Sequence, residues 1–132
     1  MAIQNRQTVT TGTIWEGIAG YVRAVRVGNL VWISGTTATD SNGAVVGHAD
    51  AAAQTRYVLQ KIESALMQLG ANRQDIVRTR IYVRDISSWE MVARAHGEFF
   101  SESKPANTLV EARLVGDEYL VEIEADALVD QP

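Results

Sequence analysis

The sequence predicts an α+β fold in which two helices pack on one face of a mixed β-sheet. Two segments have the 3.6-residue periodicity of amphipathic helices, and several others alternate between apolar and polar residues as strands do. The order is strand, strand, helix, strand, helix, strand, strand, and each helix is long enough to connect strands by a crossover. Because two helices cover only one side of such a sheet, its other side must meet water or another chain.

The first half of the chain predicts a hairpin followed by a long helix. Residues 22–27 and 30–36 alternate in polarity around a two-residue turn that contains glycine. Apolar residues at helical spacing then fill residues 50–69, with Asp50 placed to cap the helix and Gly70 placed to end it.

A strand, a helix and two more strands are predicted in the second half. Residues 76–84 alternate strictly, which places Val77, Thr79, Ile81 and Val83 on an apolar face and Arg78, Arg80, Tyr82 and Arg84 on a polar face. Residues 87–90 have the form of a capping box for a helix that ends before Pro105. Residues 108–112 and 119–128 read as the last strands.

The sheet face without helices has the character of an interface. If the alternation holds, this face carries Trp32, Arg78, Arg80, Tyr82, Glu122 and Glu124. Water could solvate it, but two large aromatic side chains beside opposite charges favour a contact between subunits.

Composition limits the classes of function. The 132 residues, of which 46% are hydrophobic, suit a single domain spanning residues 1–132. With no cysteine and two isolated histidines, we expect no metal and no cofactor. A net charge of -4 argues against a broad phosphate-binding surface. Because residues 1–13 lack the apolar core of a signal peptide and no stretch reaches membrane-spanning length, we expect a soluble cytoplasmic protein that does not associate with membranes.

Five short segments, taken in order, resemble the reactive intermediate deaminase (RidA, or YjgF) family. They are GYV at 20–22, GNLVWISG at 28–35, VRTRIYVRD at 77–85, PANTLVE at 105–111 and VEIEA at 121–125. The resemblance is nearly ungapped from residue 20 to residue 125. It implies one RidA-like domain with the chorismate-mutase-like fold, and a homotrimer with the sheets inside and the helices outside. It also implies three clefts for small-molecule ligands, one between each pair of neighbouring subunits.

The resemblance also implies roles for three residues of the cleft. Glu122 would orient the attacking water or pass a proton to the leaving ammonia, which such hydrolysis requires because water is a poor nucleophile without a base. Tyr21 would border the cleft, and the turn at Gly35 would offer a backbone carbonyl to the substrate nitrogen. Other interpretations stay open: Glu122 could pair with an arginine across the sheet, Tyr21 could be a core residue, and Gly35 could permit a bend.

One position departs from the family pattern. Imine-hydrolysing members carry an arginine after the Pro-Ala pair to hold a substrate carboxylate, and this chain has Asn107. Losing a charge-assisted hydrogen bond costs about 1.5 to 3 kcal/mol, so a carboxylate ligand would bind about 10- to 100-fold less tightly. Asn107 could instead be an ordinary polar residue that opens a strand.

Other residues could replace the missing arginine. Arg78 and Arg80 are the better candidates among the cations, which also include Arg23 and Arg26, although salt bridges to Glu122 and Glu124 are the simpler interpretation. Trp15 lies just before Tyr21, in a loop that would reach the cleft.

Three functions remain. The first is a small-molecule hydrolase of the enamine or imine deaminase type, with a substrate whose acid group is absent, different or held by another arginine. The second is a non-catalytic trimeric module that binds a metabolite and regulates a partner, which Asn107 favours because it removes an orienting charge. The third is RNA cleavage, an activity attributed to some relatives, and the negative charge without any Lys/Arg run makes it the weakest.

Overall fold

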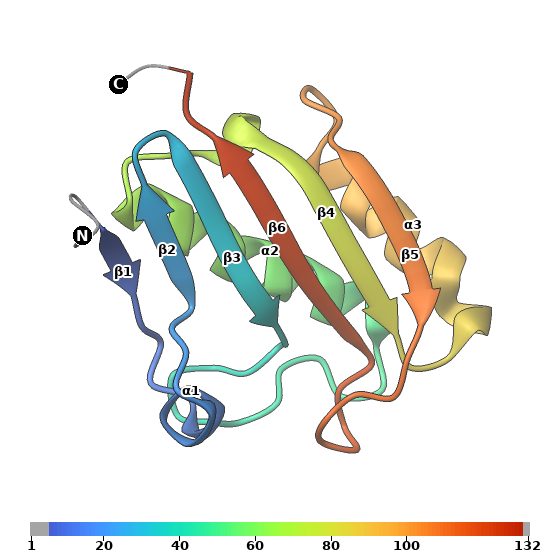
Figure 1. Ribbon diagram of the computed structural model, residues 1–132. Coiled ribbons are helices and arrows are strands. Elements are labelled where there is room, and N and C mark those ends of the chain that lie inside the picture. Colours follow the sequence, from blue (N-terminus) through green and yellow to red (C-terminus); the bar gives the residue numbers. More distant parts are fainter. Residues whose placement is uncertain (1–5, 131–132) are drawn as a thin grey trace.

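The computed structural model describes residues 6–130 and consists of a six-stranded mixed sheet with two long helices on one face (Figure 1). The strands are β1 (Gln7–Val9), β2 (Ala24–Val27), β3 (Leu30–Thr36), β4 (Ile76–Val83), β5 (Ala106–Glu111) and β6 (Val121–Leu128). They lie in the order β1-β2-β3-β6-β4-β5, in which β4 and β5 are parallel and all other neighbours are antiparallel. The α+β prediction is confirmed.

Helices α2 (Ala51–Gln68) and α3 (Trp89–Phe99) cover one face of the sheet. Two short elements were not predicted from the sequence: β1 and α1 (Ile14–Ala19), which lies at one end of the sheet (Figure 1). Elements of three and six residues are too short to show a periodic pattern. Two single-turn 3₁₀ helices, Arg73–Asp75 and Ile86–Ser88, precede β4 and α3.

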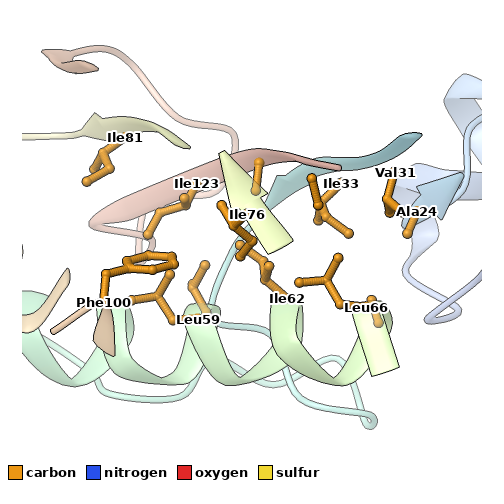
Figure 2. Close-up of a cluster of buried hydrophobic side chains, with 14 of the residues drawn as sticks. Ala24, Val31, Ile33, Leu59, Ile62, Leu66, Ile76, Ile81, Phe100 and Ile123 are labelled. Atoms are coloured by element: carbon orange, nitrogen blue, oxygen red, sulfur yellow. The ribbon is translucent and has the colours of Figure 1, made fainter. Parts of the chain in front are cut away.

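The predicted caps of α2 are confirmed, and its apolar stripe builds the core. The Asp50 carboxylate accepts a hydrogen bond from the Ala53 amide at 3.0 Å. Gly70 follows the last turn with a φ of 77°, a left-handed conformation that favours glycine. Figure 2 shows the stripe of α2 facing the sheet, and the fully buried side chains Leu59, Ile62 and Leu66 belong to it.

Two local predictions were wrong. The register between β4 and β6 shifts between Ile76 and Arg78, and this bulge breaks the alternation. As a result Val77 is 50% exposed, although the pattern placed it on the apolar face, while Ile76 fills the core. The capping box at residues 87–90 is also absent.

Asp85 organises the start of α3 instead. Its carboxylate accepts hydrogen bonds from the amide and the hydroxyl of Ser87, at 2.9 and 2.8 Å, and so caps the 3₁₀ turn that leads into α3. Glu90, the expected acidic partner of the box, pairs with Arg94 one helical turn later.

The open face of the sheet carries the predicted mixture of aromatic and charged side chains. Trp32 is 43% exposed there. The Tyr82 hydroxyl donates to Glu124 at 2.8 Å, and Arg80 lies 3.7 Å from Glu124 and 3.2 Å from Asp126. Within residues 6–130, none of the helices is both long and apolar enough to cross a bilayer.

Candidate functional site

A pocket of about 240 Å³ lies where β3 ends and β6 begins, beside α1. Its lining residues are Trp15, Tyr21, Arg23, Gly35, Thr37, Val115 and Glu122. They come from α1, from the segment that leads into β2, from the ends of β3 and β6, and from the connection between β5 and β6. Four of the sequence-predicted site residues therefore share one pocket: Trp15, Tyr21, Gly35 and Glu122.

Local contacts hold the aromatic walls of the pocket. Helix α1 ends at Gly20, whose φ of 75° turns the chain so that the Gly20 and Tyr21 amides both donate to the Glu16 carbonyl. The Trp15 ring meets the buried Tyr119 ring edge to face, with 6.0 Å between centroids. The Tyr21 ring lies 5.6 Å from the guanidinium carbon of Arg23.

Glu122 and Gly35 approach each other closely. A Cβ atom at residue 35 would overlap the Oε2 atom of Glu122, so any other residue there would displace the carboxylate. Burial raises the pKa of Glu122, while the positive charge of Arg23 lowers it and the negative charge of Glu124 raises it further. A half-buried carboxylate with a raised pKa beside a pocket is the kind of group that exchanges protons in catalysis.

Arg23 lines the same pocket, although only 2% of its surface is exposed. A guanidinium has five N–H donors, and the chain supplies an acceptor for each of them. Nε donates to Thr11 Oγ1 at 3.2 Å. Nη1 donates to the Gly35 carbonyl at 2.5 Å and to Thr36 Oγ1 at 3.2 Å. Nη2 donates to Thr13 Oγ1 at 3.5 Å and to Glu16 Oε2 at 3.2 Å. The backbone carbonyl that the family resemblance assigns to the substrate nitrogen is thus already bound by Arg23.

Glu16 balances the charge of Arg23. The carboxylate is buried and accepts hydrogen bonds from the side chains and backbone amides of both Thr11 and Thr13. Burial would raise the pKa of Glu16, but these hydrogen bonds lower it to about 2. Glu16 is therefore ionised at neutral pH, and the pair of Glu16 and Arg23 carries no net charge.

Three predicted site residues lie outside this pocket: Arg78, Arg80 and Asn107. Arg80 pairs with acidic side chains on the open face of the sheet. Arg78 lies two residues before it on β4 and does not line the pocket. Arg23 was among the cations that the sequence offered, and its position two residues after Tyr21 was the signal that could have favoured it. Thr37 and Val115 carried no such signal.

Asn107 makes a hydrogen bond within its own subunit. Its side-chain nitrogen donates to Thr79 Oγ1 at 2.9 Å, and the same hydroxyl lies 2.9 Å from Nε2 of His96. The Thr79 hydroxyl therefore joins Asn107 on β5 to His96 on α3. Burial lowers the pKa of His96 to about 4, so the imidazole is neutral at pH 7.

The fold and the pocket together match a known class of small α+β proteins. A family model described as Endoribonuclease L-PSP matches residues 12–129. The chain therefore belongs to this family, which is the RidA/YjgF family that the sequence motifs resemble.

Individual relatives agree with this assignment. The chain is 37% identical over 112 residues to 3-aminoacrylate deaminase RutC of Acinetobacter baylyi. The matched region covers 85% of this chain and 89% of that protein. It is similar to the crystal structure of Rv2704, a YjgF/YER057c/UK114 family member from Mycobacterium tuberculosis, with 46% identity, a TM-score of 0.85 and coverage of 95% and 100% of the two chains. The Escherichia coli YjgF gene product is 30% identical, with a TM-score of 0.79 and coverage of 92% and 97%.

The lowered pKa of Glu16 predicts a specific acid sensitivity. Because its folded-state value of about 2 lies below the ordinary 4.5, ionised Glu16 stabilises the fold above pH 4.5, and this stabilisation is lost as the pH falls towards 2. The shift corresponds to about 3 kcal/mol at neutral pH. We expect Glu16→Gln to lower the free energy of unfolding in urea by up to this amount at pH 7, and by progressively less at pH 4 and 3.

Glu98→Gln is the matched control, because Glu98 is an exposed glutamate that lies 3.8 Å from Arg56. This variant should behave as the native protein throughout. An effect of Glu16→Gln that is equal at pH 7 and pH 3 would contradict the assigned role of the Glu16 carboxylate.

Proposed function

We propose that the pocket hydrolyses small imines or enamines and that Glu122 is its general acid and base. The observation that carries this proposal is the half-buried Glu122 carboxylate, held against Gly35 at a pocket with aromatic walls. The similarity to a protein named 3-aminoacrylate deaminase supports the same reaction class. No metal or cofactor takes part in the proposed chemistry.

In the proposed reaction, ionised Glu122 takes a proton from a water molecule as the water oxygen bonds to the imine carbon. The proton then passes to the substrate nitrogen, which gives a carbinolamine that bears one hydroxyl and one amino group. Glu122 next moves the hydroxyl proton to this nitrogen as the C–N bond breaks, so that ammonia leaves and a carbonyl product remains. An enamine first takes a proton on carbon and becomes the imine. A carboxylate whose pKa is raised towards neutrality suits both the acceptance and the return of this proton.

The expected assembly is a homotrimer in the cytoplasm, with the open face of the sheet turned inward. Trp32 and Tyr82 lie on that face beside the ion pairs of Arg80. Aromatic and arginine side chains are enriched in interfaces between subunits. In such a trimer a neighbouring subunit would complete the wall of each pocket.

A regulatory module that binds a metabolite without turnover is the second candidate. Its support is the hydrogen bond from Arg23 to the Gly35 carbonyl, which uses one of the two lone pairs of the acceptor that would orient a substrate nitrogen. Without that orientation a pocket binds its ligand but gains little in rate. Nucleic acid is not expected as a ligand, because the pocket is small and its walls are largely aromatic and aliphatic.

Replacing Glu122 separates the two candidates. We expect native protein to accelerate ammonia release from freshly generated imines above an enzyme-free control, and Glu122→Gln to lose about 100-fold or more of this acceleration, which is typical of a missing general base. Because the base must be ionised, the native rate should rise with pH through a pKa above the ordinary 4.5 of glutamate, and the variant should lack this rise.

Glu118→Gln is the control, since Glu118 is an exposed glutamate that pairs with His48 outside the pocket. It should keep the native rate and pH profile. Glu122→Gln with full activity would exclude Glu122 as the base, and native protein that accelerates no imine would leave the regulatory module as the better description.

The assembly is tested by light scattering on the eluting protein. We expect a mass of three times 14.4 kDa. Trp32→Glu places a charge on the proposed interface and should shift the protein towards monomer, whereas Met67→Glu, at a 65% exposed position on α2, should not. A native monomer would contradict the trimer.

A further inference from the structure

The charges of the pocket show which ligands it can hold. Among the described residues that line it, Arg23 is the only cation and Glu122 is the only acid. All five donors of Arg23 bind the chain itself, and Glu16 neutralises its charge. A ligand carboxylate would therefore find no free guanidinium on the walls that one subunit supplies.

The second nearby cation is also engaged. The Lys61 ammonium group donates to the Thr37 and Thr39 carbonyls, at 3.3 and 2.9 Å. It lines a separate pocket with Thr11, Asp40 and Tyr57 and does not line the pocket of Glu122. Burial lowers the pKa of Lys61 to about 8, with the charge of Arg23 acting in the same direction. Its ammonium group therefore does not serve as an anchor for an acid in the site.

The remaining surface suits an apolar body with one nitrogen. Trp15, Tyr21 and Val115 supply aromatic and aliphatic walls, and Val115 is 72% exposed at the rim. Among residues 6–130, Glu122 has no hydrogen-bond partner, and neither do the Tyr21 hydroxyl and the Trp15 indole N–H of the same pocket. Glu122 is the acid among these groups, and as an acceptor it suits an N–H group. A carboxylate placed beside Glu122 would meet a like charge, which disfavours binding.

From these contacts we infer that the pocket takes nitrogen compounds that carry no carboxylate, with the cationic or neutral nitrogen at Glu122 and an apolar group against Trp15 and Val115. This inference rests on the proposed function of the pocket and names its substrate class. Asn107 fits the same conclusion, because its amide is bound to Thr79 and brings no positive charge.

Matched ligands test the inference directly. Benzylamine, benzamide and benzoate share one ring and differ in the charge of the polar group. We expect benzylamine and benzamide to bind at least tenfold more tightly than benzoate when the Trp15 indole N–H signal is followed by NMR, with the signal assigned by Trp15→Phe. Glu122→Gln should remove most of the advantage of benzylamine over benzoate, while Glu118→Gln should leave it unchanged.

A matched pair of substrates extends the test to catalysis. Propan-2-imine is 2-iminopropionate with a methyl group in place of the carboxylate, and we expect the protein to accelerate hydrolysis of propan-2-imine at least tenfold more. Benzoate binding as tightly as benzylamine, no binding of any ligand, or faster hydrolysis of 2-iminopropionate would each overturn the inference. If the binding preference holds and the protein hydrolyses neither imine faster than the enzyme-free control, the inferred ligand class stands and the proposed hydrolysis fails.

Discussion

The buried ion pair of Arg23 and Glu16 is the interaction on which the candidate site depends. Burying two charges costs several kcal/mol per ion unless hydrogen bonds satisfy the remaining donors and acceptors, and here the threonines of the N-terminal segment and the end of β3 do so. The pair joins α1 to the end of β3, because Glu16 belongs to α1 and Arg23 binds the Gly35 carbonyl. Trp15, adjacent to Glu16, lines the same pocket as Gly35.

The same pair sets the chemistry of the pocket. Arg23 lies close enough to Glu122 to oppose the effect of burial on its pKa, so two competing influences decide the charge of the one acid in the pocket wall. Arg23 also binds the backbone carbonyl that would otherwise be free to orient a ligand. The Arg23 guanidinium therefore does not replace the missing arginine at residue 107, because all its N–H donors bind other groups of the same chain.

Local patterns in the sequence predicted the fold well. The features that they missed are too short to show a pattern or depend on contacts between segments far apart in the chain. Helix α2 shows a full apolar stripe and both caps, whereas α1 is too short for a stripe. The bulge beside Val77 depends on the register with β6, which the β4 pattern does not contain. Tyr21, Gly35 and Glu122 were named by resemblance and share a pocket. The role of Arg23, however, depends on acceptors from five residues that only the folded chain brings together.

The most direct test of this account is a crystal structure of the protein with benzylamine bound. The account predicts the ligand nitrogen within hydrogen-bond distance of the Glu122 carboxylate, the ring against Trp15, and all contacts of Arg23 with Glu16 and Gly35 intact. A structure in which Arg23 leaves these partners to bind a ligand, or in which the ligand nitrogen lies away from Glu122, would contradict it.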